Sequence, residues 1–355
     1  MVKNNIKILM IGPLPPPTGG METVMEHIIF MKFHNIEIIP FNVTKNKFTK
    51  SFVLFNAANF IYRCLKLFWI LLIRNPSIVH IHTGSRKSFW QNAIYFKISK
   101  LMNKKIVLHI HGGAFRHFYE EQREIGGKFI KKIIESADSV IVLSNSWKHV
   151  INNISITKSL EIVQNPINVK EITKYKKTRK DNQLTILFVG RVVKEKGIYE
   201  LLDAFMKIKQ PTLKLIIMGN YDQSDKILLE YKENKSIEFL GEVRDKNLKY
   251  QIYANSDIFV LPSHIEAMPM TILEAMASGL PIIATNVGAI PEIIKNNYNG
   301  IIIHPNNVKE LVNAIKKLVA MNDLRNDVSK NNKADIKEYD ENKFKIKMER
   351  IWSKL

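Results

Sequence analysis

The sequence predicts an α/β protein built from two Rossmann-like, doubly wound parallel-sheet domains that face a central cleft. Its 355 residues exceed what a single core usually holds and suit two domains of roughly 150 to 200 residues each. Short β-branched runs alternate with helical stretches from end to end, which is typical of βαβ units. The two halves also open alike, because residues 8–12 and 186–190 both read as a buried strand that ends in glycine.

Six strand candidates fall in each half. They are residues 6–12, 37–41, 78–82, 105–111, 139–143 and 161–163, followed by residues 184–190, 213–218, 237–240, 257–261, 281–284 and 300–303. Between the halves, residues 168–183 are lysine-rich and lack apolar periodicity, which is typical of a linker. We therefore expect an N-terminal domain at 1–180, a C-terminal domain at 181–338, and a C-terminal helix at 339–355 that packs back on the N-terminal domain.

The composition indicates a folded protein of a reducing compartment. Apolar residues make up 46% of the chain and charged residues 24%, which is ordinary for a globular protein. Cys64 is the single cysteine, so no disulfide can form within the chain and no Cys/His spacing typical of zinc is present. Residues 1–5 run straight into a strand without the pattern of a signal peptide. We expect a cytoplasmic protein.

Positive charge is concentrated in the first half. The formal net charge is +20, and residues 45–132 hold 17 basic and three acidic side chains, a local balance of +14. Such a stretch attracts nucleic acid, anionic lipid or a phosphorylated substrate, although drift in an AT-rich genome would also enrich lysine. Residues 52–73 are apolar but interrupted by Asn56, Asn59, Arg63 and Lys66, which favours an amphipathic or buried helix over a membrane span.

Two loops of the first half carry residues suited to ligand binding. The loop after the first strand contains Gly19 and Gly20, where bare backbone amides can approach an anion at a helix start, although a plain turn would look the same. It lacks the G-x-G-x-x-G pattern, which disfavours a nicotinamide cofactor. His111 follows the strand at 105–110 and precedes Gly112 and Gly113, which free the backbone for close approach of a ligand. We therefore expect His111 to face the ligand.

Three other histidines, His80, His82 and His109, lie on or near predicted strand ends. For each of them we prefer a structural role.

The loop that follows residues 184–190 carries two cations. Gly190 and Arg191 end the strand, and Lys196 lies just before the next helix. Cations beside a helix N-terminus suit a diphosphate whose negative charge grows as it leaves, whereas a solvated basic loop is the alternative. Lys194 is expected to face solvent.

Residues 263–281 form the most specific segment. Pro269 suits the first helical position, which places Glu266 in the preceding loop and Glu274 about a turn and a half inside the helix. The first amides of this helix, from Met270 and Thr271, would point at a bound phosphate. Two carboxylates beside an anion site are best explained as acceptors for sugar and ribose hydroxyls.

Glu266 and Glu274 form an E-x7-E pair within Glu-Ala-Met-Pro-Met-Thr-Ile-Leu-Glu-Ala-Met-Ala-Ser-Gly-Leu-Pro. This segment resembles the signature of retaining glycosyltransferases of family 4, the group 1 glycosyl transferases with the GT-B fold. The resemblance continues through residues 282–292, the 190–197 loop, the Gly19-Gly20 loop and His111, so it spans nearly the whole chain. Ala267 and Pro269 stand where the family commonly has glycine.

The resemblance implies a role for each candidate residue. The catalytic group comprises His111 beside the reacting sugar, Arg191 and Lys196 on the diphosphate, and Glu266 on the transferred sugar. The donor-binding group comprises Glu274 on the ribose, with Gly19, Gly20, Gly190, Met270 and Thr271 placing their backbone near the donor. No metal and no other cofactor is implied.

The resemblance also implies an activity. The chain would transfer a sugar, with retention, from a nucleoside-diphosphate (NDP) sugar to a glycan or lipid-diphosphate-linked acceptor in bacterial surface polysaccharide synthesis, such as that of capsule or lipopolysaccharide. The basic first half suits peripheral association with the inner face of the plasma membrane. A nucleotide-sugar epimerase shares this architecture and is the alternative. A nucleic-acid-binding protein follows only from charge, and without a recognisable binding module we expect no nucleic-acid partner.

Overall fold

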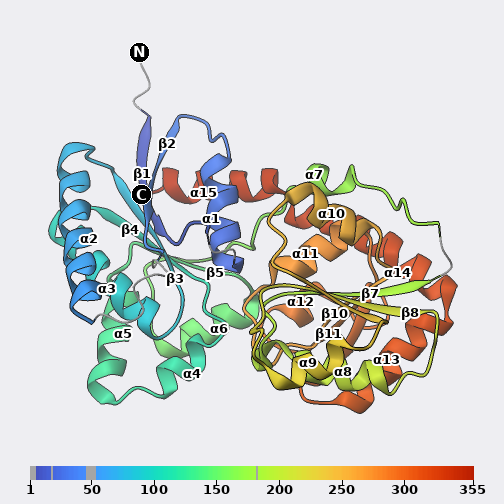
Figure 1. The fold of residues 1–355 in the computed structure, drawn as a ribbon. Helices are drawn as coiled ribbons and strands as arrows, with labels where there is room; N and C mark the ends of the chain where they lie inside the picture. The colour runs from blue at the N-terminus through green and yellow to red at the C-terminus, as the bar shows by residue number, and fades with distance from the viewer. Residues whose placement is uncertain (1–4, 17–18, 45–52, 181–182) are drawn as a thin grey trace. The chain divides into compact units, whose positions relative to one another are not determined.

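The computed structural model describes residues 5–16, 19–44, 53–180 and 183–355, and omits the side chains of residues 53–56 and 226–227. Pro17 and Thr18 of the first loop, residues 45–52 at the start of the basic stretch, and residues 181–182 of the expected linker lie outside the described residues. The chain forms two compact units (Figure 1). Unit 1 comprises Met1–Pro166 and Asn342–Leu355, and unit 2 comprises Ile167–Glu341.

Unit 1 is a parallel six-stranded sheet with the order β2-β1-β3-β4-β5-β6. Its strands are β1 (Ile6–Gly12), β2 (Ile36–Asn42), β3 (Ile78–Thr83), β4 (Lys105–Ile110), β5 (Ser139–Val142) and β6 (Leu160–Ile162). Its helices are α1 (Gly20–Phe30), α2 (Val53–Ile73), α3 (Lys87–Leu101), α4 (Phe115–Glu120), α5 (Glu124–Ser136), α6 (Asn145–Ile154) and, from Asn342 on, α15 (Glu341–Ser353). The strand order reverses between β1 and β3.

Unit 2 is a second parallel six-stranded sheet, with the order β12-β11-β10-β7-β8-β9. Its strands are β7 (Leu184–Val189), β8 (Leu213–Met218), β9 (Ile237–Gly241), β10 (Ile258–Leu261), β11 (Ile282–Thr285) and β12 (Gly300–Ile303). Its helices are α7 (Val169–Thr173), α8 (Ile198–Met206), α9 (Lys226–Lys232), α10 (Lys246–Ala254), α11 (Met270–Ala277), α12 (Ile290–Ile293), α13 (Val308–Ala320) and α14 (Asn322–Asp335), with 3₁₀ turns η2 (Lys194–Lys196) and η3 (Ile336–Tyr339). The order reverses between β7 and β10.

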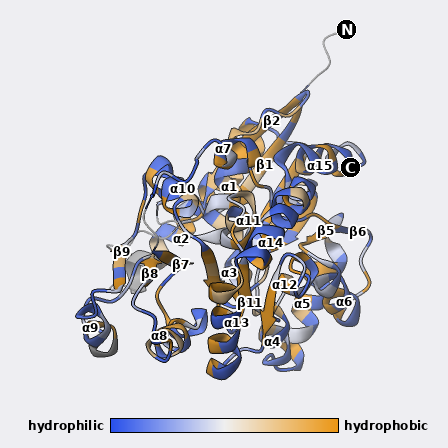
Figure 2. Ribbon diagram, turned by 90° about the vertical axis from the view of Figure 1, so that its right-hand side faces the viewer, coloured by the Kyte–Doolittle hydropathy of each residue, from blue (hydrophilic) through white to orange (hydrophobic). Residues whose placement is uncertain are grey.

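All twelve predicted strands are confirmed, within one residue at each end. They were recognisable because parallel strands covered by helices on both faces are apolar throughout. The strands β3, β5, β10 and β11 are buried at every position. Figure 2 shows the contrast in hydropathy, with β11 hydrophobic and α10 largely hydrophilic. The predicted α/β class with two doubly wound parallel sheets is therefore confirmed.

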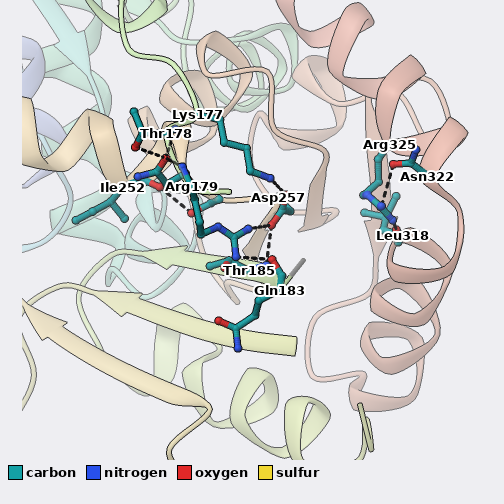
Figure 3. Close-up of polar contacts among 12 residues, drawn as sticks. Lys177, Thr178, Arg179, Gln183, Thr185, Ile252, Asp257, Leu318, Asn322 and Arg325 are labelled. Carbon is teal, nitrogen blue, oxygen red and sulfur yellow. Dashed lines mark hydrogen bonds and ion pairs between the residues drawn. The ribbon is translucent and has the colours of Figure 1, made fainter. Parts of the chain in front are cut away.

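The predicted linker begins as part of unit 2. Asn168 caps α7 by accepting a hydrogen bond from the Glu171 amide at 2.8 Å, and Ile172 of this helix is buried. Farther on, Lys177 and Arg179 bind the two carboxylate oxygens of Asp257, each at 2.5 Å (Figure 3). Asp257 also accepts from the Thr185 amide at 2.8 Å.

These contacts explain why the boundary between the units falls at residue 166/167, ahead of the sequence-based boundary near residue 180. Polar composition predicted a linker, whereas ion pairs with a residue 80 and 78 positions away fasten the segment to unit 2.

The C-terminal helix α15 belongs to unit 1 from Asn342 on. Its Glu349 accepts a hydrogen bond from the His34 amide at 2.7 Å, and its Trp352 is buried against the ring of Phe33, with 5.0 Å between centroids. The chain therefore returns to unit 1 after completing unit 2.

Candidate active site

In unit 2, the candidate residues lie where the strand order reverses. The strands β7 and β10 are parallel neighbours on either side of this reversal, so the loops that follow them leave the same edge of the sheet. Ligands of doubly wound sheets bind at this position. The loop after β7 contains Arg191 and Lys196, and the loop after β10 contains Glu266.

The loop after β7 presents one exposed cation and packs closely at its end. Among the residues that the structure describes, the guanidinium of exposed Arg191 has no hydrogen-bond or ion-pair partner. Gly197 has a φ of +68°, and a Cβ there would lie 2.0 Å from the Pro262 carbonyl oxygen. Glycine therefore allows this loop to contact the loop after β10, and the His264 amide adds a hydrogen bond to the Glu195 carbonyl at 2.9 Å.

Lys196 and Glu266 meet directly. The Lys196 Nζ lies 2.5 Å from Glu266 Oε1, and Ser263 Oγ donates to the same oxygen at 2.9 Å. The side chain of Glu266 is only 9% exposed and that of Lys196 is 21% exposed. A carboxylate offers about four acceptor positions, so Glu266 retains acceptor capacity for a ligand hydroxyl.

A third loop holds the backbone of Glu266 in place. Gly288, which follows β11, has a φ of +57°, and a Cβ on it would lie 2.1 Å from the Glu266 carbonyl oxygen. The neighbouring Ala289 amide donates to the Ala267 carbonyl at 2.8 Å. The position of Glu266 thus depends on loops from β10 and β11, which are adjacent strands.

Helix α11 begins one residue later than the sequence predicts. Pro269 is its N-cap, with ψ of 123°, so the prediction that Pro269 occupies the first helical position is wrong by one residue. Helix ends commonly shift by this amount, and with proline at either position the amides of the next two residues have no partner within the helix. In the described part of the chain no side chain caps this end, which leaves the amides of Met270 and Thr271 available to a ligand.

Glu274 is enclosed by two side chains of α10 that sequence reasoning missed. Its side chain is 1% exposed, and its two oxygens lie 2.6 Å from Lys249 Nζ and 2.8 Å from Tyr253 Oη. Burial, with the charge of Glu274, raises the pKa of Tyr253 well above its usual value, so this phenol donates to the carboxylate. The available signal was the i, i+4 spacing of Lys249 and Tyr253 on one helix face.

In unit 1, Gly19 and Gly20 lie at the start of α1. Gly19 is the N-cap, and its carbonyl accepts from the amide and the hydroxyl of Thr23, both at 2.9 Å. A Cβ on Gly20 would meet no atom of the described residues within 4 Å. The backbone at Gly20 is therefore open to approach.

His111 follows β4 and joins a layer of four histidine rings, with His80, His82 and His109. Its Nε2 lies 2.8 Å from His82 Nδ1, and its ring centroid lies 4.0 Å from that of His109. Burial lowers the pKa of His80 and His111 to about 3, and lowers the pKa of His82 and His109 well below its usual value. All four imidazoles are neutral at pH 7.

Gly112 serves packing. A Cβ on it would lie 2.9 Å from the Ser85 amide and 2.3 Å from the Ser85 hydroxyl. The sequence suggested that this glycine lets a ligand approach the backbone, whereas in the structure the loop after β3 fills that space.

The fold resembles solved structures over nearly the whole chain. A sucrose-phosphate synthase from Thermosynechococcus elongatus superposes with a TM-score of 0.78 over 98% of both chains, at 16% identity. Anabaena Alr3699/HepE, in complex with UDP and glucose, gives a TM-score of 0.76 over 99% of this chain and 100% of that one, at 18% identity. The two parallel-sheet units thus define a GT-B fold.

The sequence comparisons identify the family. Residues 34–171 match the model described as Glycosyltransferase Family 4, and residues 169–335 match the one described as Glycosyl transferases group 1. Together the two models cover residues 34–335, so the chain belongs to the group 1 glycosyl transferases of family 4, as the E-x7-E segment predicted.

Its relatives include CapM of Staphylococcus aureus, a capsular polysaccharide biosynthesis glycosyltransferase, which is 31% identical over 62% of this chain and 60% of CapM. The uncharacterized glycosyltransferase MJ1607 of Methanocaldococcus jannaschii is 34% identical over 44% of this chain and 41% of its own. The chain spans less than two thirds of the length of both relatives.

Proposed function

We propose that the chain transfers a sugar, with retention of anomeric configuration, from an NDP-sugar to a glycan or lipid-linked acceptor in bacterial surface polysaccharide synthesis. The observation that carries the proposal is the Lys196–Glu266 pair at the strand-order reversal of unit 2. An ammonium held against a carboxylate beside uncapped helix amides suits a ligand that has hydroxyls next to a diphosphate.

The donor is bound along the loops of unit 2. Arg191 and Lys196 contact the diphosphate together with the amides of Met270 and Thr271, while the backbone at Gly190 borders the donor. Glu266 accepts from hydroxyls of the transferred sugar, and Glu274 from those of the ribose. In unit 1, His111 and the backbone of Gly19 and Gly20 serve the reacting sugar and the acceptor.

The transition state is an oxocarbenium-like sugar that separates from a leaving NDP. Negative charge grows on the diphosphate as the bond breaks, and cations and amides fixed beforehand stabilise it without reorganising. We propose that Arg191, Lys196 and the N-terminus of α11 supply the positive charge that stabilises the leaving diphosphate, in place of a metal. Transfer in excess EDTA at the rate seen without it is the expected result.

A donor-binding screen and two variants test the proposal. UDP-, GDP-, ADP- and dTDP-sugars are compared by thermal shift, beginning with UDP-sugars because HepE was solved with UDP. Glu274→Ala should weaken donor binding, whereas Arg191→Ala should lower turnover by roughly a hundredfold, the effect of losing one preorganised contact. Lys194→Ala is the matched control, since Lys194 is exposed in the same loop.

Unchanged kinetics in both variants, at equal folded fraction, would refute the assignment. A new epimer formed from UDP-sugar alone would favour the epimerase alternative.

The apolar face of α2 supports a membrane-bound acceptor. Its exposed side chains recur every three or four residues and so share one face of the helix. They are Ile61, Tyr62, Leu65, Phe68, Trp69, Leu72 and Ile73, each between 42% and 72% exposed. Leu67 and Leu71 are buried on the opposite side. A continuous stripe of this size marks an interaction surface.

A bilayer surface is the partner that fits this face best. Tyr62 and Trp69 are side chains that favour the interface between lipid and water, and Lys66 on the same helix is exposed. No helix in the described part of the chain is long and apolar enough to cross a membrane. The helix α2 would therefore lie in the plane of the inner leaflet, with anionic headgroups beside Lys66.

Flotation with vesicles that contain anionic lipid tests this face. The double variant Leu65→Ser, Trp69→Ser should lose vesicle binding, while Leu101→Ser, which removes an apolar side chain 83% exposed on α3, should keep it. Equal flotation of both variants, or none by the wild type at low salt, would contradict the membrane proposal.

The Campylobacter jejuni relative, 29% identical over 54% of this chain, is named for a diphospho-undecaprenol substrate, which makes undecaprenyl-diphosphate glycans the first acceptors to try.

A further inference from the structure

In the layer of four histidines, the donor and the acceptor of each hydrogen bond can be assigned by starting from Trp352. Trp352 on α15 has an indole N–H that can only donate, and it lies 3.2 Å from His80 Nδ1. His80 Nδ1 must therefore be the unprotonated nitrogen of a neutral ring, and His80 Nε2 carries the hydrogen. That nitrogen lies 3.3 Å from His109 Nδ1, which accepts.

The hydrogen of His109 therefore lies on Nε2. This nitrogen and His82 Nε2 are buried and have no hydrogen-bond partner among the described residues. Buried polar groups are rarely left unbonded. The rings of His82 and His109 lie 4.9 Å apart between centroids, and His80, His82 and His109 each have one ring nitrogen within 4.8 Å of one on the other two rings. One water molecule between the two unbonded nitrogens would therefore satisfy both.

The bridging water molecule determines which ring nitrogen of His82 carries the hydrogen. A water that accepts from His109 Nε2–H can donate to His82 Nε2 if that nitrogen is unprotonated. If His82 Nε2 also carried hydrogen, the water would accept twice and both of its own hydrogens would be left unbonded in the core. Hydrogen-bond satisfaction therefore places the His82 hydrogen on Nδ1, which donates to His111 Nε2 at 2.8 Å.

The same reasoning argues against a metal ion bound by the three buried rings. Each neutral imidazole has one lone pair for coordination, and those of His80 and His109 are already accepting hydrogen bonds. Only His82 Nε2 remains. The rings of His80 and His82 are also stacked at 11°, so their in-plane lone pairs do not converge on one point.

We propose that Trp352 and His82 are positioning residues, which hold His111 in the tautomer with hydrogen on Nδ1. Every hydrogen bond in this series has its donor on the Trp352 side and its acceptor on the His111 side. His111 is also the one ring of the four that is not fully buried. His111 therefore presents an N–H to its ligand. If the proposed function holds, this N–H donates a hydrogen bond to an oxygen of the NDP-sugar, either on the sugar or on the diphosphate.

Long-range ¹H–¹⁵N NMR on protein labelled with ¹⁵N-histidine tests the proposal, because protonated and unprotonated ring nitrogens have well-separated shifts. We expect wild-type His111 to show a protonated Nδ1 and an unprotonated Nε2 at pH 7.5, with His111→Gln used to assign its signals. A protonated Nε2 on His111 would overturn the proposal. Because no substrate is present, this result is independent of whether the chain transfers sugar.

The variant Trp352→Phe removes the first donor in this series of hydrogen bonds. Mixed tautomers of His80 and His111 are expected, whereas Phe33→Leu, which alters the same ring contact and keeps the indole N–H, should preserve the wild-type pattern. Unchanged tautomers in Trp352→Phe would show that Trp352 does not position them. Added Co²⁺ should leave the histidine signals unaltered, and a stoichiometric Co²⁺ absorption band lost in His82→Gln would also overturn the assignment.

Discussion

Acidification should destabilise unit 1 selectively, because the histidine layer cannot accept protons while it is folded. Burial holds the pKa of His80 at about 3 and lowers the pKa of His82 and His109 in the same direction. In the unfolded chain each has an ordinary pKa of about 6.5. Above pH 6.5 both states are neutral and the layer carries no penalty. Below it the unfolded state binds protons that the folded state does not, so stability falls as the pH falls from 6.5 toward 3.

The size of the effect follows from the number of rings. Between pH 7.5 and 5.5, each fully buried ring loses roughly 1 to 2 kcal/mol of stabilisation, so the three together lose about 4 kcal/mol. That is a large share of the 5 to 15 kcal/mol typical of a domain. His111 shifts in the same direction, so it adds to the loss.

Tryptophan fluorescence during urea unfolding measures this effect in unit 1. All four tryptophans, Trp69, Trp90, Trp147 and Trp352, belong to unit 1. We expect the free energy of unfolding to fall by at least about 4 kcal/mol between the two pH values, because His111 adds to the loss from the three fully buried rings. His109→Gln should reduce the pH slope by about one proton, while His117→Gln, at a site 69% exposed, should not change it. A wild-type midpoint that is the same at pH 7.5 and 5.5 would show that the rings protonate freely in the fold.

Three further predictions concern unit 2. Lys249→Met leaves the buried carboxylate of Glu274 without its cation, so it should destabilise unit 2 by about 2 to 3 kcal/mol by circular dichroism and weaken donor binding; Lys249→Met with Glu274→Gln should recover stability but not binding. Gly288→Ala should reduce transfer at least tenfold, because its Cβ would displace the Glu266 backbone, whereas Gly241→Ala, also at positive φ but with open space, should not. Asp257→Ala should expose residues 174–180 to limited proteolysis, and Glu242→Ala, which removes an ion-pair partner of exposed Arg244, should not; equal digestion of both would contradict this account.

The sequence was most informative about strands and about one segment of the site. Strands such as β10 and β11 are buried on both faces, so burial alone determines their composition, and no long-range knowledge is needed to find them. The E-x7-E segment was recognisable because Glu266, the helix start and Glu274 are close in sequence.

Contacts between distant segments were not predictable in the same way. Lys249 and Tyr253 meet Glu274 across more than 20 residues, and their i, i+4 spacing places them on one helix face without indicating which residue that face contacts. The same holds for Asp257, whose partners turn an apparent linker into part of unit 2. Gly112 shows a related difficulty, because its spacing signals close backbone approach but not whether a ligand or the chain itself approaches.

The return of residues 342–355 to unit 1 makes unit 2 an insertion, with consequences for the order of folding during synthesis. Residues 339–341 and Ile167 are hydrogen-bonded to one another, so the two ends of the inserted segment lie together and unit 2 can close before translation finishes. Unit 1 has to wait, because Trp352 is synthesised after the whole of unit 2. Until then His80 lacks its donor, and the nascent first unit is the part that chaperones would need to protect.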